Sequence, residues 1–222
     1  MDRKIYGIFL AGGRGVRMGG GTPKQFLDLG GKPVLQRTIE TFVEAVPGIE
    51  VITVLPEGER ARWEELCEKH VFNCKQRLVK GGMTRFHSVR NALAKVPDGA
   101  VVMIHDGVRP LVGKDLIAAL LAAVENGGGA IPVTPVTDTL RSTEPGVPDP
   151  DRSKLVAVQT PQVFLSEDIK AAYAQAYEPS FTDDASVAAK KGIPVTLVPG
   201  DRYNIKITTP EDLAVVRAVS GL

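Results

Sequence analysis

The sequence predicts an α/β fold in which helices cover both faces of a mainly parallel sheet. Two observations lead to this prediction. Short apolar runs typical of buried strands alternate with segments of helical periodicity along most of the 222 residues, a pattern that favours parallel strands joined by helices. The hydrophobic content is 43%, as in globular proteins, and a chain of this length buries a sizeable core. We therefore expect a single Rossmann-like domain over residues 1–222.

The first half of the chain supplies strands and helices in regular order. Strands are expected at 5–11, 49–56, 77–82, 100–106 and 130–136, and helices at 33–46, 57–70, 84–96 and 114–129. In the first helix Val34, Leu35 and Ile39 recur at helical spacing. Pro33 is expected at its first position, where proline is favoured. An Asn-Gly pair at 126–127 is expected to end the fourth helix.

The alternation breaks at residues 137–155, which are polar, rich in proline and without a helical period. This segment is expected to be either a disordered loop or a projecting β-arm. Prolines interrupt β ladders, so Pro145, Pro148 and Pro150 leave the pairing of such an arm open.

Regular alternation returns after this segment. We expect strands within 155–164, 193–200 and 204–209, and helices near 166–178, at 182–191 and from Thr209-Pro210 onward. In such sheets ligands bind beyond the carboxyl ends of the strands. The segments that follow strands, namely 11–24, Gly81-Gly82, Asp106 and 136–139, are therefore expected to gather at one rim.

Composition excludes several classes of partner. The formal net charge is +1, so the chain has no bulk electrostatic attraction for nucleic acid or an anionic membrane. No apolar run reaches the roughly 18 residues that a membrane span needs, and the apolar start of the chain is expected to be a strand. With two cysteines, a disulfide framework is not expected and a reducing cytoplasm fits.

The segment from Leu10 to Leu35 is rich in glycine, and two common phosphate-binding patterns fail in it. Met18 stands where the dinucleotide fingerprint has its last glycine, and Pro33 follows Gly31-Lys32 where the P-loop has serine or threonine. What remains is a strand followed by a glycine loop whose backbone N–H groups can approach a phosphate chain. Arg17 and Lys24 add charge that can stabilise a phosphoryl group during displacement.

This loop, Leu-Ala-Gly-Gly-x-Gly-x-Arg-Met from Leu10 followed by Pro23-Lys24-Gln25, resembles the signature of nucleotidyltransferases. Further segments extend the resemblance along nearly the whole chain to one family, the 2-C-methyl-D-erythritol 4-phosphate cytidylyltransferases of non-mevalonate isoprenoid synthesis. These segments are Gly81-Gly82, Thr84-Arg85, Ser88-Val89, His105-Asp106, Arg109-Pro110, Asp138-Thr139, Asp151-Arg152, Gln159-Thr160-Pro161-Gln162, 182–186 and Asn204-Ile205-Lys206.

The resemblance implies transfer of CMP from CTP to a sugar-alcohol phosphate, and it implies roles for individual residues. Arg17 and Lys24 would hold the CTP phosphates and stabilise the transition state. The nucleotide would also lie against Ala11, Gly12, Gly13, Gly15, Gly82, Ser88 and Asp106. Mg²⁺ or another divalent cation is implied because it bridges triphosphate oxygens, and Asp106 could touch either this metal or the acceptor hydroxyls.

On the acceptor side, the resemblance implies that Arg152 and Lys206 grip the acceptor phosphate, with Thr139 assisting. Arg109 could hold the acceptor or simply pair with an acid. Thr182 could reach the acceptor, or it could cap a helix with Asp183 and Asp184 in its first turn. The acceptor set is thus Asp106, Arg109, Thr139, Arg152, Thr182 and Lys206.

The family resemblance also implies a homodimer in which the arm at 137–155 is exchanged between subunits, so that Thr139 and Arg152 serve the partner's site. Two alternatives remain open. The acceptor could be ribitol 5-phosphate, since the relatives that use it share the glycine loop and much of the arm. The chain could also be a nucleotide-binding protein without catalysis, although Arg17 and Lys24 argue against this.

Overall fold

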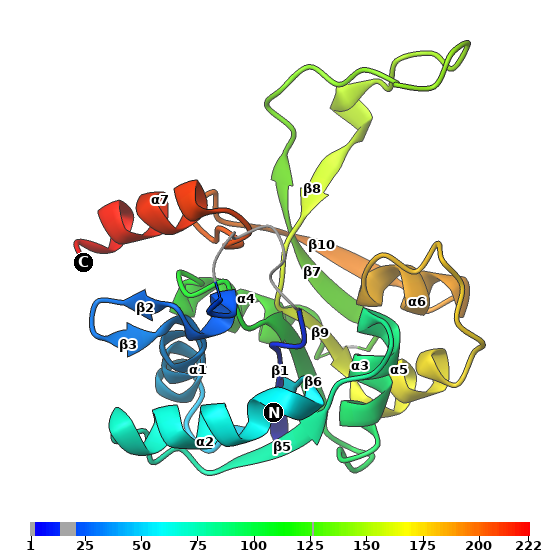
Figure 1. The fold of residues 1–222 in the computed structure, drawn as a ribbon. Helices are drawn as coiled ribbons and strands as arrows, with labels where there is room; N and C mark the ends of the chain where they lie inside the picture. The colour runs from blue at the N-terminus through cyan, green and yellow to red at the C-terminus, as the bar shows by residue number, and fades with distance from the viewer. Residues whose placement is uncertain (1–2, 14–20, 126) are drawn as a thin grey trace.

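The computed structural model describes residues 3–13, 21–125 and 127–222. Its main sheet runs in the order β10-β7-β9-β6-β1-β4-β5 (Figure 1). The strands are β1 (Ile5–Leu10), β4 (Glu50–Leu55), β5 (Gln76–Lys80), β6 (Val101–Asp106), β7 (Gly129–Pro135), β9 (Gln162–Leu165) and β10 (Val195–Pro199). β1 is parallel to β4 and β6, as is β4 to β5 and β10 to β7, whereas β9 is antiparallel to both of its neighbours.

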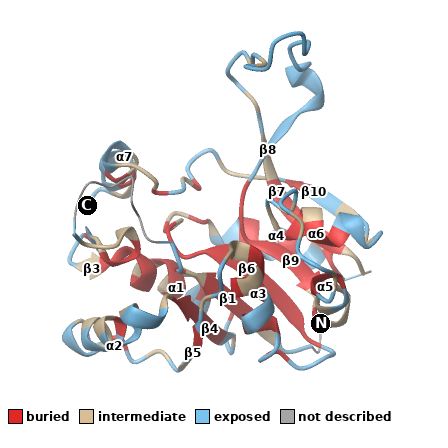
Figure 2. Ribbon diagram, turned by 45° about the vertical axis from the view of Figure 1, so that its right-hand side comes forward, coloured by how far each residue is buried: buried red, intermediate tan, exposed pale blue. Residues whose placement is uncertain are grey.

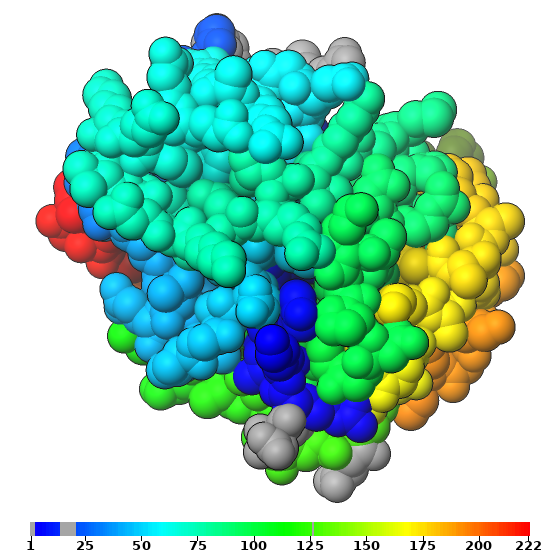
Figure 3. All heavy atoms as spheres, turned by 90° about the horizontal axis from the view of Figure 1, so that it is seen from below, coloured from blue at the N-terminus to red at the C-terminus, as the bar shows by residue number. Residues whose placement is uncertain are grey.

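Helices cover both faces of this sheet, as expected. The helices are α1 (Val34–Ala45), α2 (Arg60–Lys69), α3 (Arg85–Leu93), α4 (Lys114–Ala123), α5 (Ser166–Tyr173), α6 (Asp184–Lys190) and α7 (Pro210–Ser220). Along β6, Val101 and Met103 pack with the cluster that contains α1, α2 and α4, while Val102 and Ile104 pack with the cluster that contains α3, α5 and α6. This alternation is what a strand buried on both faces requires. Seen from below, these two sets of elements lie on either side of β1 (Figure 3).

A smaller cluster joins the C-terminal helix to the body. The hairpin of β2 (Asp28–Leu29) and β3 (Lys32–Pro33) packs with α7 through apolar side chains that include Leu29, Val34 and Val216. Thr209 caps α7 in a capping box with Asp212, as its Thr-Pro start predicts.

The projecting segment leaves the body at the top of β7 (Figure 1). β8 (Val156–Val158) pairs antiparallel with the end of β7, from Val133 opposite Val158 to Pro135 opposite Val156. Residues 136–155 hold no strand and only one 3-10 turn, η4 (Arg152–Lys154). The expected β-arm is therefore a short ladder at its base with an irregular, mostly exposed tip (Figure 2), as its prolines favour.

Several expected boundaries were wrong. Pro33 precedes α1 rather than opening it. The helix expected at 114–129 ends at Ala123, because β7 already begins at Gly129 and the turn between them needs Gly127 and Gly128 at positive φ. The helices expected at 57–70 and 166–178 are likewise shorter, with the short 3-10 turn η3 (Glu57–Glu59) before α2.

In the C-terminal half two strand predictions and one cap prediction failed. The segment 155–164 splits into β8 and β9, which pair in different places. Residues 204–209 form no strand, because their carbonyl and amide groups meet side chains and a loop instead of a ladder. Thr182 does not cap a helix: Asp183 is the cap of α6, in a box with Ser186.

Candidate active site

A cavity of about 280 Å³ opens where β1, β5 and β6 end. It is lined by Leu10, Ala11, Gly12, Gly13, Lys24, Gln25, Gly82, Met83, Thr84, Arg85, Ser88, Asp106, Val108 and Lys206. The expected gathering at one rim therefore occurs for the glycine loop, Gly82 and Asp106. It fails for 136–139, which continue into the arm. Arg17 and Gly15 lie outside the described residues.

The described part of the glycine loop is held from below by Gln25. Its buried amide donates to the Ala11 carbonyl at 2.9 Å, which fixes the chain as it leaves β1. The Lys24 side chain passes close to Gly13, since a Cβ placed on that glycine would lie 4.0 Å from Lys24 Cε. The loop therefore presents backbone and a lysine stem to the cavity.

The opposite wall is the start of α3, where Ser88 organises the backbone. The Gly82 N–H donates to Ser88 Oγ at 3.0 Å, and Ser88 Oγ donates to the Thr84 carbonyl at 3.0 Å. Thr84 caps the helix through its own hydroxyl. A Cβ on Gly82 would lie 2.3 Å from the Cβ of His87, so this approach requires glycine.

Asp106 sits at the floor of the cavity among cations. Its Oδ2 lies 3.0 Å from Lys206 Nζ and 3.3 Å from Arg109 Nε. Burial alone would raise the pKa of the Asp106 carboxyl, but Lys206, Arg85 and Arg109 outweigh it and hold the pKa well below its usual range. Asp106 is therefore an anion at neutral pH. Its charge is more than balanced by those of its neighbours.

His105 fixes the turn that carries Asp106 and Arg109. Its Nε2 faces the Arg109 carbonyl at 3.1 Å, and a carbonyl only accepts, so Nε2 carries the proton. Nδ1 then accepts from the Thr160 hydroxyl at 3.0 Å, and Thr160 Oγ1 accepts from the Asp106 N–H at 3.1 Å. Burial lowers the pKa of His105 to about 4, which keeps this tautomer neutral. The sequence favours a structural role for His105 beside Asp106, and its support of this turn is such a role.

Lys206 and Arg109 are placed by a second set of buried amides. Arg109 Nη1 donates to the Asn204 carbonyl at 2.7 Å. The Asn204 side chain donates to the Thr160 carbonyl at 2.8 Å, and Gln159 donates to the Asp201 carbonyl at 2.8 Å. The Gln-Thr-Pro segment after β8 thus holds the segment that carries Lys206.

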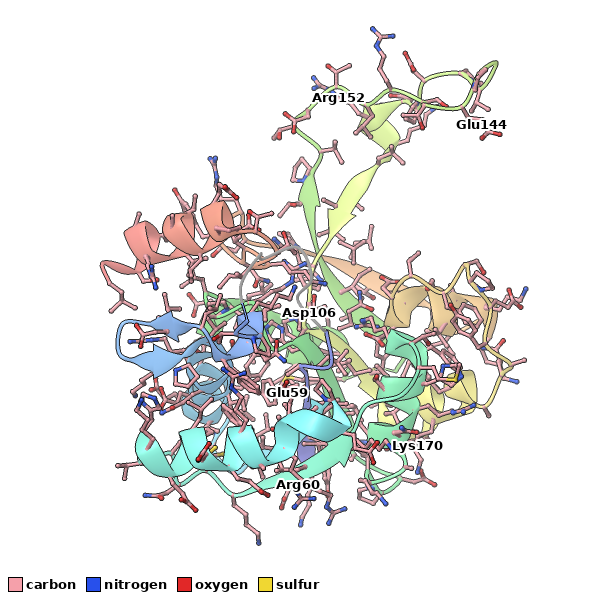
Figure 4. All side chains as sticks on the ribbon, in the orientation of Figure 1. Glu59, Arg60, Asp106, Glu144, Arg152 and Lys170 are labelled. Carbon is pink, nitrogen blue, oxygen red and sulfur yellow. The ribbon has the colours of Figure 1, made fainter. Side chains whose placement is uncertain are left out.

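Three of the expected acceptor residues lie away from this cavity. Figure 4 shows Arg152 on the arm, far from Asp106 in the body. Arg152 is exposed and donates to the Thr137 carbonyl at 2.7 Å, and Thr139 is exposed in the same arm. Thr182 is exposed ahead of α6 and does not line the cavity. A single copy of the chain therefore does not bring Thr139, Arg152 and Thr182 to the cavity that Asp106 lines.

The described residues offer little to a resident metal ion. They contain no cluster of three or more His, Cys, Asp or Glu side chains suited to one. Asp106 is the acidic side chain that lines the cavity, and both cation contacts above are to its Oδ2. A single carboxylate fits a Mg²⁺ ion that keeps its waters and takes most other ligands from a phosphate chain.

Arg85, Asp184 and Tyr173 form a buried group that sequence reasoning passed over. Arg85 lines the cavity and makes two hydrogen bonds to Asp184. The pairing joins residues 99 positions apart, so no local sequence pattern predicts it. The sequence signal for this group is the Thr84-Arg85 pair at the start of α3. The family resemblance includes this pair but assigns no role to Arg85.

Membrane insertion finds no support in the part of the chain that the structure describes, where no helix has the length and apolar character to cross a bilayer.

Comparison with known proteins gives a consistent result. The family model described as 2-C-methyl-D-erythritol 4-phosphate cytidylyltransferase matches residues 5–220. Two curated proteins with that name are close in sequence. The one from Bacteroides fragilis is 49% identical over 213 residues, 96% of this chain and 97% of its own. The one from Porphyromonas gingivalis strain W83 is 48% identical over 220 residues, 98% of each chain.

Solved structures agree. A 4-diphosphocytidyl-2C-methyl-D-erythritol synthase from Anaerococcus prevotii superposes with a TM-score of 0.82 at 28% identity, covering 99% of both chains. The 2-C-methyl-D-erythritol 4-phosphate cytidylyltransferase from Thermus thermophilus gives a TM-score of 0.76 at 32% identity, covering 97% of this chain and 98% of that one.

Proposed function

The chain belongs to the family of 2-C-methyl-D-erythritol 4-phosphate cytidylyltransferases, and we propose from this premise how its cavity divides between two substrates. It transfers CMP from CTP to 2-C-methyl-D-erythritol 4-phosphate and releases pyrophosphate. The match over nearly the whole chain carries this conclusion, and the names of the relatives favour methylerythritol phosphate over ribitol phosphate as acceptor.

The nucleotide half of the cavity is the glycine loop and the start of α3. We assign Gly12, Gly13 and Gly15 with Lys24 and Arg17 to the triphosphate. The cytosine ring is assigned to Ala11, Gly12, Gly82 and Ser88. The Gly82 N–H donates to Ser88 Oγ, and a Cβ on Gly12 would lie 3.9 Å from the same oxygen. The two glycine backbones therefore approach Ser88 closely, which supports this assignment because it leaves little room for a purine.

The acceptor half is assigned to Asp106, Arg109 and Lys206. A phosphate oxygen of the acceptor attacks the α-phosphorus of CTP, a new P–O bond forms, and the bond to the β-phosphate oxygen breaks as pyrophosphate leaves. The acceptor phosphate is already ionised and needs no strong base. The residues therefore act by positioning and by neutralising charge, and the excess of cations around Asp106 supports that role.

A bound Mg²⁺ ion is proposed, and it would neutralise part of the negative charge of the triphosphate. Asp106 would supply its protein ligand. Removal of divalent cations with EDTA is expected to abolish turnover, and added Mg²⁺ is expected to restore it.

The arm is proposed to serve a second copy of the chain. Thr139 and Arg152 are exposed on the arm and distant from Asp106 of their own chain, which supports a homodimer with exchanged arms. Exposed apolar side chains near the base of the arm, Leu155, Val156 and Val158, support burial of this surface against another subunit. Thr182 is likewise assigned to the acceptor, from the resemblance alone.

Pyrophosphate release tests the function. The purified chain with CTP and Mg²⁺ is expected to release pyrophosphate with methylerythritol phosphate. Arg17→Ala is expected to lower turnover by about 10²–10⁴-fold, because this charge acts on the transition state. Arg14→Ala, which removes a cation from the same loop at a position where the motif accepts any residue, is the matched control and should change turnover little.

Release with ribitol phosphate alone would overturn the acceptor. CTP binding without release of pyrophosphate with either acceptor would instead indicate a binding protein.

A further inference from the structure

Arg85 is the first residue of α3 and lines the cavity, but the function proposed above assigns it to neither substrate. Its side chain is 29% exposed, and its outer end is tied back into the body. Nη1 donates to Asp184 Oδ1 at 2.8 Å and Nη2 to Asp184 Oδ2 at 2.6 Å. This is the two-pronged geometry that arginine makes with a carboxylate, and it fixes the plane of the guanidinium as well as its place.

The carboxylate that holds Arg85 is itself held. Asp184 is fully buried, and the Tyr173 hydroxyl donates to its Oδ1 at 2.5 Å. The Tyr173 ring stacks on Phe86 with centroids 4.7 Å apart, so the phenol lies in a defined position between α5 and α3. Asp184 cannot turn without losing one of these three bonds.

Such a buried group is a poor device for stability alone. Apolar residues often replace a buried ion pair without loss of stability, since desolvation of the charges offsets their attraction. A fixed guanidinium at the wall of a cavity has another use. Arginine has five N–H donors, of which the bonds to Asp184 occupy two, so three remain for a ligand.

Arg85 belongs to the start of α3, but it lines the cavity together with Asp106 and Lys206 of the acceptor half. Arg85 acts on the Asp106 carboxylate, where its contribution to lowering the pKa follows that of Lys206 and precedes that of Arg109. Asp106, Lys206 and Arg85 all line the same cavity. An oxygen-rich anion placed against Asp106 and Lys206 would therefore meet the guanidinium of Arg85.

We propose that Arg85 is a binding residue for the acceptor, held in place by Asp184 and Tyr173, and that its free N–H groups donate to hydroxyl or phosphate oxygens of the sugar-alcohol phosphate. The inference rests on the proposed function, because it adds a residue to the acceptor half of that site. Arg85 acts by orienting the acceptor oxygen toward the α-phosphorus.

Steady-state kinetics with each substrate varied in turn tests the proposal. Arg85→Lys keeps a cation beside Asp184 but loses the planar fork. It is expected to raise the KM for methylerythritol phosphate by about 10–100-fold, as expected for lost bonds to a charged group, with the KM for CTP nearly unchanged. Tyr173→Phe keeps the ring on Phe86 and removes one bond to Asp184, so the same KM should rise by about 2–10-fold. Arg90→Lys, on an exposed position of the same helix, is the control and should leave both KM values unchanged.

The proposal is tested by whether the KM for methylerythritol phosphate rises while the KM for CTP stays unchanged. Arg85 as a mere brace for α3 would disturb Ser88 and Gly82, and the KM for CTP would rise as much as that for the acceptor. That result, or an unchanged KM for the acceptor, overturns the proposal. Thermal unfolding shows whether each variant folds, and if Arg85→Lys does not, Tyr173→Phe alone decides. Wild type in the same assay is the check on the function itself, and its inactivity would remove both proposals.

Discussion

In the body, Asp106 is 7% exposed and meets Lys206 and Arg109 from two directions, whereas in the arm Arg152 is exposed and donates to a neighbouring carbonyl. The body surrounds its polar side chains with buried amides and hydroxyls such as Gln159, Thr160 and Asn204. Among the residues that the structure describes, the side-chain hydrogen bonds of the arm, such as those of Arg141 with Asp149 and of Arg152 with Thr137, join arm residues to one another.

This difference separates two ways of placing a functional group. Folding of one chain places the groups of the body, because displacing any of them leaves a buried polar atom without a partner. The arm residues have no such penalty in a single chain, since water replaces each of their contacts. Their placement for catalysis therefore has to come from the surface that they meet in a second copy.

The largest effect is expected for a substitution in the arm. Arg152→Ala should lower turnover by about 10²–10³-fold through the lost charge on the acceptor phosphate, with an unchanged unfolding temperature because the side chain is exposed. Lys206→Ala should be similarly inactive. Unfolding and refolding the two variants together should restore about a quarter of wild-type turnover, because half of the random dimers have one site with both residues intact.

A mixture that stays inactive would mean that each arm serves its own body. Mixing Arg152→Ala with itself is the control, and it should restore nothing.

Acid should unfold the body through His105. Its pKa in the folded chain is about 4, against an ordinary value near 6.5. Between these values the unfolded chain binds a proton that the folded chain does not, so stability is complete above about pH 6.5 and falls as the pH falls toward 4. The loss should reach about 3 kcal/mol and then level off.

Urea unfolding at several pH values measures this loss. His105→Gln should flatten the dependence in that range, whereas His87→Gln, at a partly exposed position of α3, should retain it. Equal slopes in the wild type and His105→Gln would contradict the assignment.

The smallest effect is expected in the arm, where the same type of substitution can be compared with one in the body. Asp149→Asn breaks the arm pair with Arg141, whose side chains are 45% and 79% exposed respectively, and should cost less than about 1 kcal/mol of unfolding free energy. Asp184→Asn leaves Arg85 without its buried partner and should cost about 3–5 kcal/mol. Chemical denaturation of both variants measures the two costs, and similar values would show that the arm is as firmly built as the body.

Much of this division is visible in the sequence. The apolar runs identified β1, β4 and β6 because strands buried on both faces need continuous apolar residues. The break at 137–155 marked the segment that leaves the sheet, because prolines interrupt a β ladder, but it left open whether that segment is a disordered loop or an arm. Helix ends were less well predicted, since the end of α4 depends on where β7 has to begin.

For the site, local pattern found the glycine loop, Gly82 and Asp106, which stand at the ends of strands. It could not find Asp184 or Thr160, because a buried hydrogen bond between distant segments leaves no periodic trace. Asp183 and Asp184 looked like two acids in one helical turn. In the fold, one caps that helix and the other holds Arg85.

A chain of hydrogen bonds runs from the Asp106 amide through Thr160 and His105 to the Arg109 carbonyl. It also limits which substitutions this sequence can accept. It runs in one direction, since its first member can only give a proton and its last can only receive one. A substitution at His105 or Thr160 leaves two of the links facing the wrong partner. Descendants of this chain should therefore keep both residues or exchange them together, although neither one touches a substrate.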